Sequence, residues 1–384
     1  MTASSELSAS DAPAPLDERW RADAHRDQIA ALPEGRAVVS CPAPLDGGGL
    51  GRHLREILDA LERGERPNAC IRRPSAEVAG RSGDVELQAG WRSSLAAPLA
   101  RSSRAWRMWA TSVDFDSAAA RRLPAADHLL AFNGTAVAQL RRAPRAGFSS
   151  GMLVSATSHV RQVLASHQLA HSQYPIERPW VSHLVRRHLE EYRRADRILV
   201  STPYVRESFL REGHDEARLV RFPLTPHPRY VPPRSGEQDA SPTFDVVYVG
   251  GLLVAKGVPL LIDAVARLAH SDLRLVLVGG WGTRSMRRYL ESARRRDPRV
   301  TIVAGDPLPV LQRARLYVHP AYNDGFGYAP AEALACGVPV IVTEDTGMKE
   351  LIESGRNGLV VPTGELEVLV ESIDAAYRGE LLRG

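Results

Sequence analysis

The feature that most limits the possible folds is a regular alternation of short apolar runs and helical patterns over the last third of the chain. The apolar runs are Asp245–Gly250, Leu273–Gly279, Val300–Val303, Leu316–His319, Val338–Val342 and Gly358–Val361. Helical patterns follow them at about 258–269, 284–296, 308–314, 328–335, 348–354 and 365–378. Strands that alternate with helices pair in parallel, and the helices cover both faces of the sheet. This part is therefore predicted to form a doubly wound α/β domain.

The N-terminal part repeats this rhythm less clearly. Its candidate strands are Ala37–Cys41, Leu129–Phe132, Met152–Ser155 and Ile198–Ser201. Amphipathic helices are expected from about Arg52 to Leu61 and from Trp180 to Arg194. We therefore predict an α/β fold with two Rossmann-like doubly wound domains that face each other across a cleft. The predicted divisions are a disordered leader at 1–18, an N-terminal domain at 19–225, a proline-rich linker at 226–242 and a C-terminal domain at 243–384.

Length and composition favour a cytoplasmic protein. The 384 residues suffice for two domains with full cores. No apolar run approaches the roughly 18 residues of a membrane span, and the N-terminus lacks the apolar region of a signal peptide. Cys41, Cys70 and Cys336 are scattered and are expected to be free thiols. The net charge of +4 comes from the N-terminal part, which favours either peripheral contact with the inner membrane or an ordinary solvated, arginine-rich surface.

One stretch of the C-terminal part has the residues of an anion-binding site. Asp324-Gly325-Phe326-Gly327 lies between a predicted strand and a predicted helix, and Glu332 follows within that helix. Glycines let a ligand approach the backbone closely, and the first N–H groups of a helix can bind an anion. The stretch is therefore predicted to hold a phosphorylated small molecule.

Two further glycine-rich segments precede predicted helices. The segment Gly250–Gly257 contains Lys256, which together with Lys349 supplies the only lysines among 49 basic residues. A lysine at this place in an arginine-rich chain favours a phosphate contact, although packing alone would also explain the loop. The segment Asp46–Gly51 is either a site loop or a flexible surface loop.

These motifs together resemble those of the retaining glycosyltransferase family 4, which has the GT-B fold. The resemblance covers most of 244–378 and extends loosely to 36–60 and 195–201. It implies an enzyme without metal or cofactor that moves a hexosyl group from a UDP- or GDP-type nucleotide sugar to an acceptor hydroxyl. The acceptor would be a saccharide, a lipid-linked molecule or a small molecule. The setting would be bacterial polysaccharide, glycolipid or natural-product glycoside synthesis.

The resemblance also implies roles for individual residues. Lys256 would neutralise the donor diphosphate, Asp324 would lie near the donor sugar and Glu332 would bind ribose hydroxyls. His159 would orient the reacting sugar, although neighbours such as His167 are rivals for this role. The other implied donor contacts are Gly250, Gly251, Gly280, Gly325, Phe326 and Gly327, and the implied acceptor and diphosphate loop contains Gly48 and Gly49.

Two positions depart from the family pattern. Gly251 stands where arginine is common, which removes one phosphate-binding charge, and Arg284 is a candidate replacement. Asp324 stands where glutamate is usual, so its carboxylate reaches roughly 1.5 Å less far. These changes would shift the choice of donor sugar or weaken activity.

Three other motifs have simpler explanations. Asp114-Phe115-Asp116 resembles a metal-binding pattern, but Asp116 fits a helix N-cap better, so no metal is predicted. The arginines from Arg284 to Arg299 have only one aromatic residue among them, Tyr289, so no nucleic acid is predicted. The segment Gly279–Thr283 is either a nucleotide contact or a turn with a packed Trp281.

Two other functional classes remain open. A sugar-nucleotide epimerase or phosphorylase on the same fold would not depend on an acceptor. An inactive nucleotide-sugar-binding scaffold is suggested only by Gly251 and Asp324. A dinucleotide dehydrogenase is disfavoured, because neither glycine loop has the Gly-x-Gly-x-x-Gly pattern with an acid in the expected place.

Overall fold

The computed structural model describes residues 18–75, 83–88, 90, 104–179, 181–233 and 243–382. Within these residues the chain is an α/β protein with two parallel sheets. Apart from Glu18 and residues 226–233, the predicted leader and linker lie outside the described residues.

The C-terminal unit is built on a 6-stranded parallel sheet with the strand order β10-β9-β8-β11-β12-β13. The strands are β8 (Phe244–Val249), β9 (Leu273–Val278), β10 (Val300–Val303), β11 (Leu316–His319), β12 (Val340–Thr343) and β13 (Gly358–Val361). The order reverses between β8 and β11, as in a doubly wound sheet. The predicted strands and their parallel pairing are confirmed.

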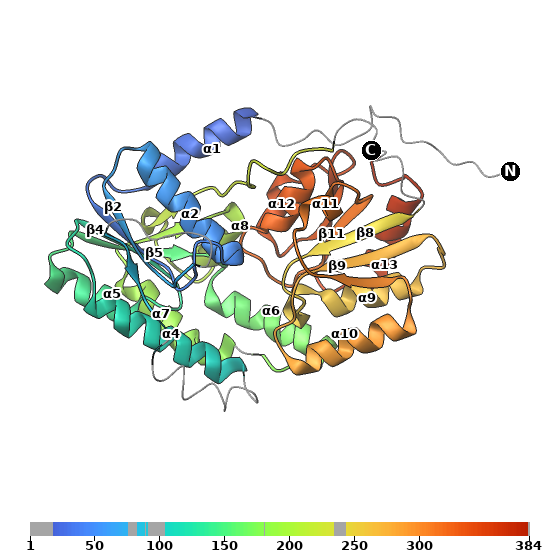
Figure 1. Ribbon diagram of the computed structural model, residues 1–384, viewed down its shortest axis with the longest axis horizontal. Coiled ribbons are helices and arrows are strands. Elements are labelled where there is room, and N and C mark those ends of the chain that lie inside the picture. The colour runs from blue at the N-terminus through green and yellow to red at the C-terminus, as the bar shows by residue number, and fades with distance from the viewer. Residues whose placement is uncertain are drawn as a thin grey trace. The chain divides into compact units, whose positions relative to one another are not determined.

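Helices cover both faces of this sheet (Figure 1). Helices α9 (Val258–Arg267), α10 (Arg284–Arg296) and α13 (Leu366–Tyr377) lie on one side, and α11 (Leu308–Leu311) and α12 (Tyr328–Ala335) lie on the other. The predicted helix at 348–354 is instead a 3₁₀ helix, η5 (Gly347–Leu351). Side chains of α9 and α13 pack with those of β8, β9 and β11 in one apolar core; examples are Leu261, Ile373, Val246, Leu275 and Val318.

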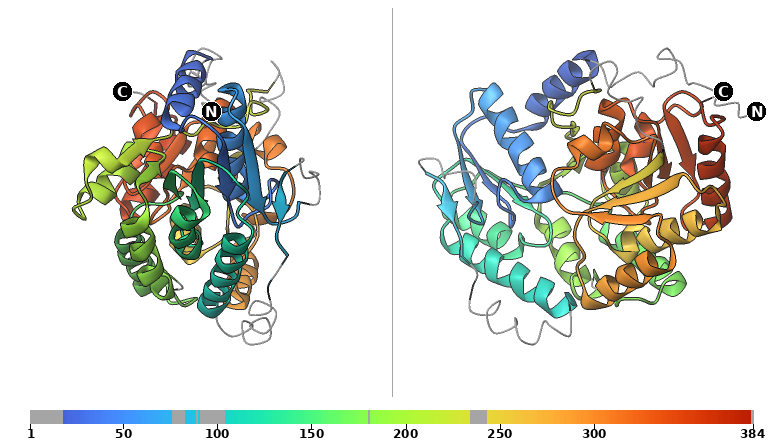
Figure 2. Two further views of the ribbon diagram at one scale, coloured as in Figure 1. Left: turned by 90° about the vertical axis from the view of Figure 1, so that its left-hand side faces the viewer. Right: turned by 45° about the vertical axis from the view of Figure 1, so that its right-hand side comes forward.

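The N-terminal unit contains a 7-stranded parallel sheet with the order β3-β2-β1-β4-β5-β6-β7. The strands are β1 (Ala37–Ser40), β2 (Asn68–Arg72), β3 (Val85–Glu86), β4 (His128–Phe132), β5 (Ser150–Ser155), β6 (Arg197–Val200) and β7 (Leu219–Arg221). The sequence missed β2, β3 and β7, since these strands are short or have no continuous apolar run. The right-hand view of Figure 2 shows strands of both sheets from a further direction.

The helices that lie wholly or partly in the N-terminal unit cover both faces of its sheet (Figure 1). They are α1 (Glu18–Ala31), α2 (Gly48–Arg63), α4 (Arg104–Arg121), α5 (Val137–Arg142), α6 (Val160–Gln173), α7 (Val185–Arg194) and α8 (Pro203–Leu210), with 3₁₀ helices η1 (Ala143–Ala146), η2 (Val181–His183) and η3 (Glu216–Arg218). The helix predicted from Trp180 to Arg194 is therefore divided into η2 and α7.

Among the described residues, the division of the chain differs from the prediction at 19–21, 165–178 and 225. One compact unit contains residues 22–75, 83–88, 90, 104–164, 179 and 181–224, and the other contains residues 18–21, 165–178, 225–233 and 243–382. Residues 165–178 include the second half of α6, which the sequence assigned to the N-terminal domain. Hydrogen bonds explain the change, because Gln173 accepts from the Tyr322 hydroxyl and donates to the Gly364 oxygen at 3.3 Å. Ala170 is also part of the C-terminal core.

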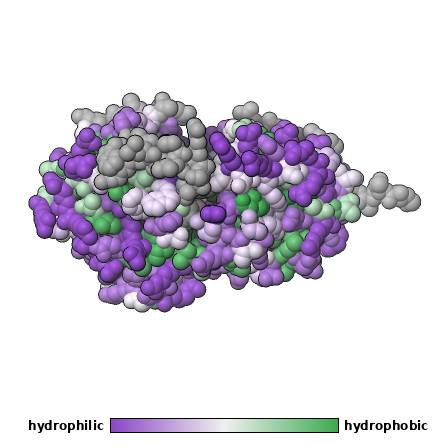
Figure 3. Space-filling view, turned by 90° about the horizontal axis from the view of Figure 1, so that it is seen from below, coloured by the Kyte–Doolittle hydropathy of each residue, from purple (hydrophilic) through white to green (hydrophobic). Residues whose placement is uncertain are grey.

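The surface drawn in Figure 3 is mostly hydrophilic, and its hydrophobic side chains lie in small separate groups. No helix among the described residues is long and apolar enough to cross a membrane.

Candidate donor-binding site at the carboxyl edge of the C-terminal sheet

The carboxyl edge of the C-terminal sheet brings Lys256 beside the segment that follows β11. Lys256 ends the 3₁₀ helix η4 (Val254–Lys256), and Gly257 follows with a φ of +70°. A Cβ atom on Gly257 would meet the Pro320 oxygen at 1.9 Å, so only glycine allows this close approach. The Tyr322 N–H also donates to the Ala255 oxygen at 3.1 Å. These contacts fix η4 against the residues that follow β11.

Lys256 and Asp324 form an ion pair at this edge. The distance from Lys256 Nζ to Asp324 Oδ2 is 2.7 Å, and Nζ also donates to the Asn323 oxygen at 3.3 Å. His319, the last residue of β11, lies with Nε2 3.0 Å from the same Oδ2. The side chains of Lys256 and Asp324 are 29% and 23% exposed, whereas that of His319 is 4% exposed. Two motifs far apart in the sequence therefore meet at one carboxylate that solvent can reach.

Asp324 is held in place by its backbone as well as by its side chain. Its N–H donates to the Asp345 oxygen at 3.1 Å, and its carbonyl accepts from the Gly347 N–H at 3.0 Å. Burial acts to raise the pKa of Asp324, but the charge of Lys256 and the hydrogen bond from His319 outweigh it and hold the pKa well below its usual range. Asp324 is therefore ionised at neutral pH and acts only as a hydrogen-bond acceptor.

The glycine segment after Asp324 leads directly into α12. Gly327 has a φ of +86° and stands immediately before the helix, which no side chain caps. Phe326 is buried, and its ring meets that of Tyr328 edge-on at 5.0 Å. Glu332 lies within α12 and is fully buried, so its predicted contact with a ribose stays a prediction. Gly325 links this segment to Asp324.

The loops after β8 and β9 are joined to each other at the same edge. The Gly250 N–H donates to the Val278 oxygen, and the Leu252 N–H donates to the Gly280 oxygen, both at 2.9 Å. Trp281 is 46% exposed, and the Arg287 guanidinium lies 5.9 Å from its ring centroid. A contact of this segment with a nucleotide stays a prediction.

The position with a missing arginine also lies in the loop after β8. Gly251 is exposed, and its carbonyl accepts a hydrogen bond from the Tyr248 hydroxyl at 3.0 Å. Arg284 is the exposed first residue of α10, which begins after the loop that follows β9. Its role as a replacement cation stays a prediction.

In the N-terminal unit, Gly48 and Gly49 form the first turn of α2 and do not precede it. The helix begins four residues earlier than Arg52, where the prediction placed it, because the Gly51 N–H donates to the Gly47 oxygen at 3.1 Å. Its apolar face, which includes Leu54, Ile57 and Leu61, is buried. No side chain caps the helix, which leaves its amino end with backbone donors.

His159 follows β5 in the N-terminal unit and is 1% exposed. Its ring packs against Tyr192, Phe209 and His214 at centroid distances of 4.9, 5.2 and 5.3 Å. Burial lowers the pKa of His159 to about 4. The residue therefore lies in a buried aromatic cluster as a neutral imidazole, and its predicted contact with the reacting sugar stays a prediction.

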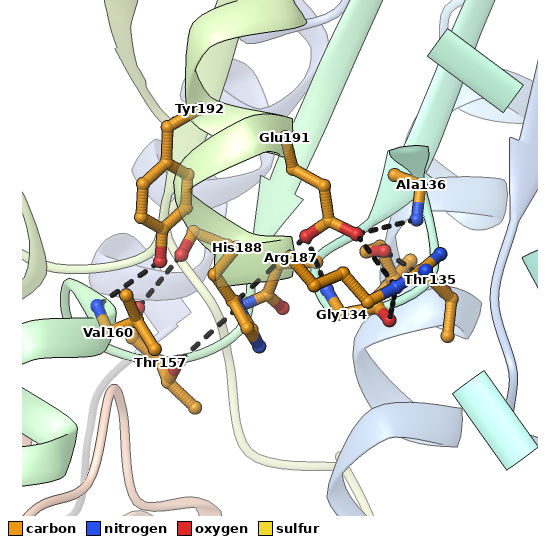
Figure 4. Close-up of polar contacts among 12 residues, drawn as sticks. Gly134, Thr135, Ala136, Thr157, Val160, Arg187, His188, Glu191 and Tyr192 are labelled. Carbon is orange, nitrogen blue, oxygen red and sulfur yellow. Dashed lines mark hydrogen bonds and ion pairs between the residues drawn. The ribbon is translucent and has the colours of Figure 1, made fainter. Parts of the chain in front are cut away.

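A buried carboxylate supports the loop after β4 (Figure 4). Glu191 on α7 accepts hydrogen bonds from the N–H groups of Gly134 and Ala136 at 2.6 and 2.8 Å. Arg187, one turn earlier, donates to the Gly134 oxygen at 2.7 Å and lies 3.7 Å from the Glu191 carboxylate. Burial raises the pKa of Glu191 to about 7, against the hydrogen bonds from Ala136 and Gly134. No local sequence pattern predicts this support.

Asp116 has a different role from the one predicted. It lies well inside α4, so it is not the N-cap of its own helix. Its carboxylate accepts from the N–H groups of Ala138 and Gln139 at 2.7 and 3.1 Å, and also pairs with Arg187. It therefore caps the amino end of α5 from a neighbouring helix. No group of three potential metal ligands occurs among the described residues.

Comparison with known proteins identifies the C-terminal part of the chain. Residues 235–383 match the family described as "Glycosyl transferases group 1". This segment is a group 1 glycosyltransferase domain. It contains all the donor-site residues described above, from Gly250 to Glu332.

Curated relatives of this glycosyltransferase domain include two bacterial proteins. The chain is 28% identical over 147 residues to the "Capsular polysaccharide biosynthesis glycosyltransferase CapM" of Staphylococcus aureus. This alignment covers 36% of the chain and 38% of CapM. It is also 28% identical over 208 residues to a "D-inositol 3-phosphate glycosyltransferase" of Acidothermus cellulolyticus. That alignment covers 49% of the chain and 43% of the relative. The matches therefore span about two fifths of the length of these relatives.

Solved structures extend the likeness to both units. A sucrose-phosphate synthase from Thermosynechococcus elongatus matches 90% of this chain and 92% of its own with a TM-score of 0.66 and 19% identity. HepE of Anabaena, solved "in complex with UDP-glucose", matches 91% and 92% of the two chains with a TM-score of 0.64 and 17% identity. At these identities the likeness shows the fold, and the predicted GT-B fold class is confirmed.

The candidate site also contains His319, for which the sequence predicted no role. His319 was noted only as part of a matching strand, although it contacts Asp324 directly. Its position was the available signal, because a polar residue at the carboxyl end of a parallel strand points to the edge where doubly wound domains bind ligands.

Proposed function

We propose that the chain is a retaining glycosyltransferase that moves a hexosyl group from a nucleotide-diphosphate sugar to an acceptor hydroxyl without a metal ion. The observation that carries this proposal is the 2.7 Å contact between Lys256 and Asp324. It joins a cation suited to phosphate and a carboxylate suited to sugar hydroxyls at the ligand-binding edge of a group 1 glycosyltransferase domain.

The donor diphosphate would lie between Lys256 and the amino end of α12. Lysine carries three N–H donors, of which two meet Asp324 and Asn323, so a third can bind a phosphate oxygen. The Gly325–Gly327 segment allows close approach of the backbone. These groups would stabilise the charge that grows on the diphosphate as it leaves. The chemistry therefore requires no metal.

The transfer step breaks the bond between the sugar C1 and the phosphate oxygen and forms one between C1 and the acceptor oxygen on the same face. The acceptor proton passes to the departing phosphate oxygen, so no separate carboxylate base is needed. Asp324 accepts a hydrogen bond from the donor sugar and does not attack it. In the N-terminal unit, the amino end of α2 at Gly48 and Gly49 would serve the acceptor.

A thermal-shift panel with UDP-, GDP-, ADP- and TDP-glucose tests donor binding. HepE is titled as a complex with UDP-glucose, so that compound is the first to test. Ligand at about 100 times its dissociation constant should stabilise the protein by about 2.7 kcal/mol. Lys256→Ala should abolish this stabilisation, whereas Arg267→Ala, which removes a cation paired with Glu367 on the surface, should preserve it. No stabilisation by any of the four would reject the proposal.

A product assay with the best donor tests the transfer itself. Incubation with saccharide, lipid-linked and small-molecule acceptors should give a glycoside with the anomeric configuration of the donor, read by NMR, and EDTA should not reduce the rate. Turnover without any acceptor would instead indicate an epimerase or a hydrolytic activity. We place the enzyme in the cytoplasm, with its acceptor in solution or at the inner membrane, and vesicle co-sedimentation distinguishes the two.

A further inference from the structure

The side chain of Asp324 is one methylene shorter than the glutamate expected at this position. Its hydrogen bonds show which of its two carboxylate oxygens is available to a ligand. Both of its side-chain donors, Lys256 Nζ and His319 Nε2, meet the same oxygen, Oδ2. No donor among the described residues contacts Oδ1, while the side chain is 23% exposed. The carboxylate is thus fixed through one oxygen and has the other available to a ligand.

We infer that His319 is a positioning residue for donor recognition: it fixes Asp324 through Oδ2 so that Oδ1 accepts a hydrogen bond from a hydroxyl of the donor's hexosyl group. This inference rests on the proposed function and identifies a determinant of donor specificity within it.

His319 is well suited to hold a carboxylate rigidly. His319 as a whole is 3% exposed. Its ring lies nearly parallel to those of Tyr248 and Tyr317, at centroid distances of 6.2 and 6.3 Å. A carboxylate can only accept, so Nε2 carries the proton and donates to Asp324. Nδ1 lies 3.5 Å from the Tyr317 hydroxyl. Packing and hydrogen bonding together leave the imidazole little freedom to turn.

The two tyrosines connect His319 to the loop after β8. The Tyr317 hydroxyl donates to the Val249 oxygen at 3.2 Å, and the Tyr248 hydroxyl donates to the Gly251 oxygen at 3.0 Å. This loop precedes Lys256 and is the predicted phosphate loop. The same buried layer therefore sets the positions of the phosphate loop and of the carboxylate that faces the sugar.

Lys256 alone could not hold Asp324 during the reaction. Its side chain is flexible and 29% exposed, and a diphosphate would compete for its charge. His319 is neither exposed nor shared with the phosphate. When the donor binds, Lys256 also donates a hydrogen bond to the phosphate and holds Asp324 less firmly. The hydrogen bond from His319 then keeps Asp324 in place.

The test compares a nucleoside diphosphate with its sugar, because the diphosphate lacks the hydroxyl that Asp324 would recognise. Dissociation constants are measured by calorimetry for UDP and UDP-glucose, or for the base and sugar that stabilise the wild type best. His319→Phe keeps an aromatic ring in the stack and removes the donor. It should leave UDP binding within about threefold of wild type and weaken UDP-glucose binding by about tenfold, the worth of one hydrogen bond to a charged group.

Two further variants separate positioning from a purely structural role. In His319→Gln the side-chain amide can place an N–H near the position of Nε2, and it should restore most of the preference. Asp324→Asn should lose the same preference as His319→Phe, and the double variant should lose no more than either, because both act through one carboxylate. In Asp324→Asn only the binding ratio is compared, since the variant also disturbs Lys256.

A matched control exists at the opposite edge of the same sheet. His270 precedes β9 and pairs with Asp374 at 2.6 Å, so His270→Phe breaks a similar pair away from the site. It should leave both dissociation constants unchanged. Equal weakening of UDP and UDP-glucose by His319→Phe, or no weakening of either, would overturn the inference while the proposed function stands. Failure of every nucleotide sugar to bind the wild type would overturn the proposed function, and this inference with it.

Discussion

Glu191 and Asp324 are both acidic residues near the carboxyl ends of parallel strands, but they have opposite surroundings. Glu191 is fully buried, and each of its oxygens accepts from a backbone N–H of the loop after β4. Asp324 is partly exposed, and only one of its oxygens is engaged, by two side chains. The first has its hydrogen-bonding capacity used by the fold, whereas the second retains capacity for a ligand.

The pKa values of the two residues shift in opposite directions, because burial dominates at Glu191 and a neighbouring charge outweighs burial at Asp324. Burial raises the pKa of Glu191 to about 7, because its neutral backbone donors do not fully replace water. The Lys256 charge holds the pKa of Asp324 below its usual range in spite of burial. A shifted pKa alone therefore does not mark a ligand site, and the free oxygen is the better criterion.

The largest loss of stability is expected for Glu191→Ala. The substitution leaves the N–H groups of Gly134 and Ala136 buried without their acceptor and Arg187 without one of its carboxylates. Breaking such a buried charge arrangement should reduce the free energy of unfolding by about 3–5 kcal/mol. Urea denaturation measures this loss.

The neighbouring Glu190 gives the matched control. It pairs with Arg194 and Arg141 at the surface, and Glu190→Ala should change the free energy of unfolding by less than about 1 kcal/mol. Equal effects of the two substitutions would show that Glu191 does not have the structural role that its contacts indicate.

The second-largest effect on stability is expected when the pH is lowered, because the N-terminal unit contains buried histidines. Burial lowers the pKa of His53, between Phe132 and Phe222, to about 3. The folded state then binds fewer protons than the unfolded state below about pH 6.5, so stability is lost as the pH falls. His53→Phe should remove about 2 kcal/mol of the loss between pH 7 and pH 5, at about 1.4 kcal/mol per unit. His159 and His188 titrate in the same direction, so unfolding is compared between variant and wild type at both pH values.

The two units also differ in how well the sequence predicted them. In the C-terminal unit, strand, loop and helix follow each other closely, so the order of elements and the approach of Lys256 to Asp324 could be expected. In the N-terminal unit the supporting contacts come from distant elements: Asp116 on α4 caps α5, and Glu191 on α7 holds the loop after β4. Neither pairing leaves a local pattern. The role of His319 was missed for a similar reason, since a histidine ending an apolar strand looks like part of that strand.

A smaller effect is expected at the glycines of α2. Gly48 has a φ of +56°, and a Cβ atom there would meet no atom within 4 Å. Gly48→Ala should therefore cost only the backbone strain of this conformation, about 1–2 kcal/mol. Gly51→Ala should cost more, since its Cβ would lie 2.4 Å from the Pro44 oxygen. If Gly48→Ala weakens glycosyl transfer far more than it weakens folding, measured as rate against unfolding free energy, the amino end of α2 belongs to the site.

The smallest change in stability is expected for Lys256→Met, although its effect on activity should be large. The pair with Asp324 is partly exposed and His319 remains bonded to the carboxylate, so the free energy of unfolding should fall by no more than about 1 kcal/mol. The rate of glycosyl transfer should fall by about 10²–10³, as when one preorganised charge partner of a transition state is lost. Urea denaturation and the transfer assay on one preparation measure both. A stability loss as large as that of Glu191→Ala would show that Lys256, like Glu191, is needed mainly to stabilise the fold. An acidic residue with a free oxygen would then no longer indicate a ligand site in this protein.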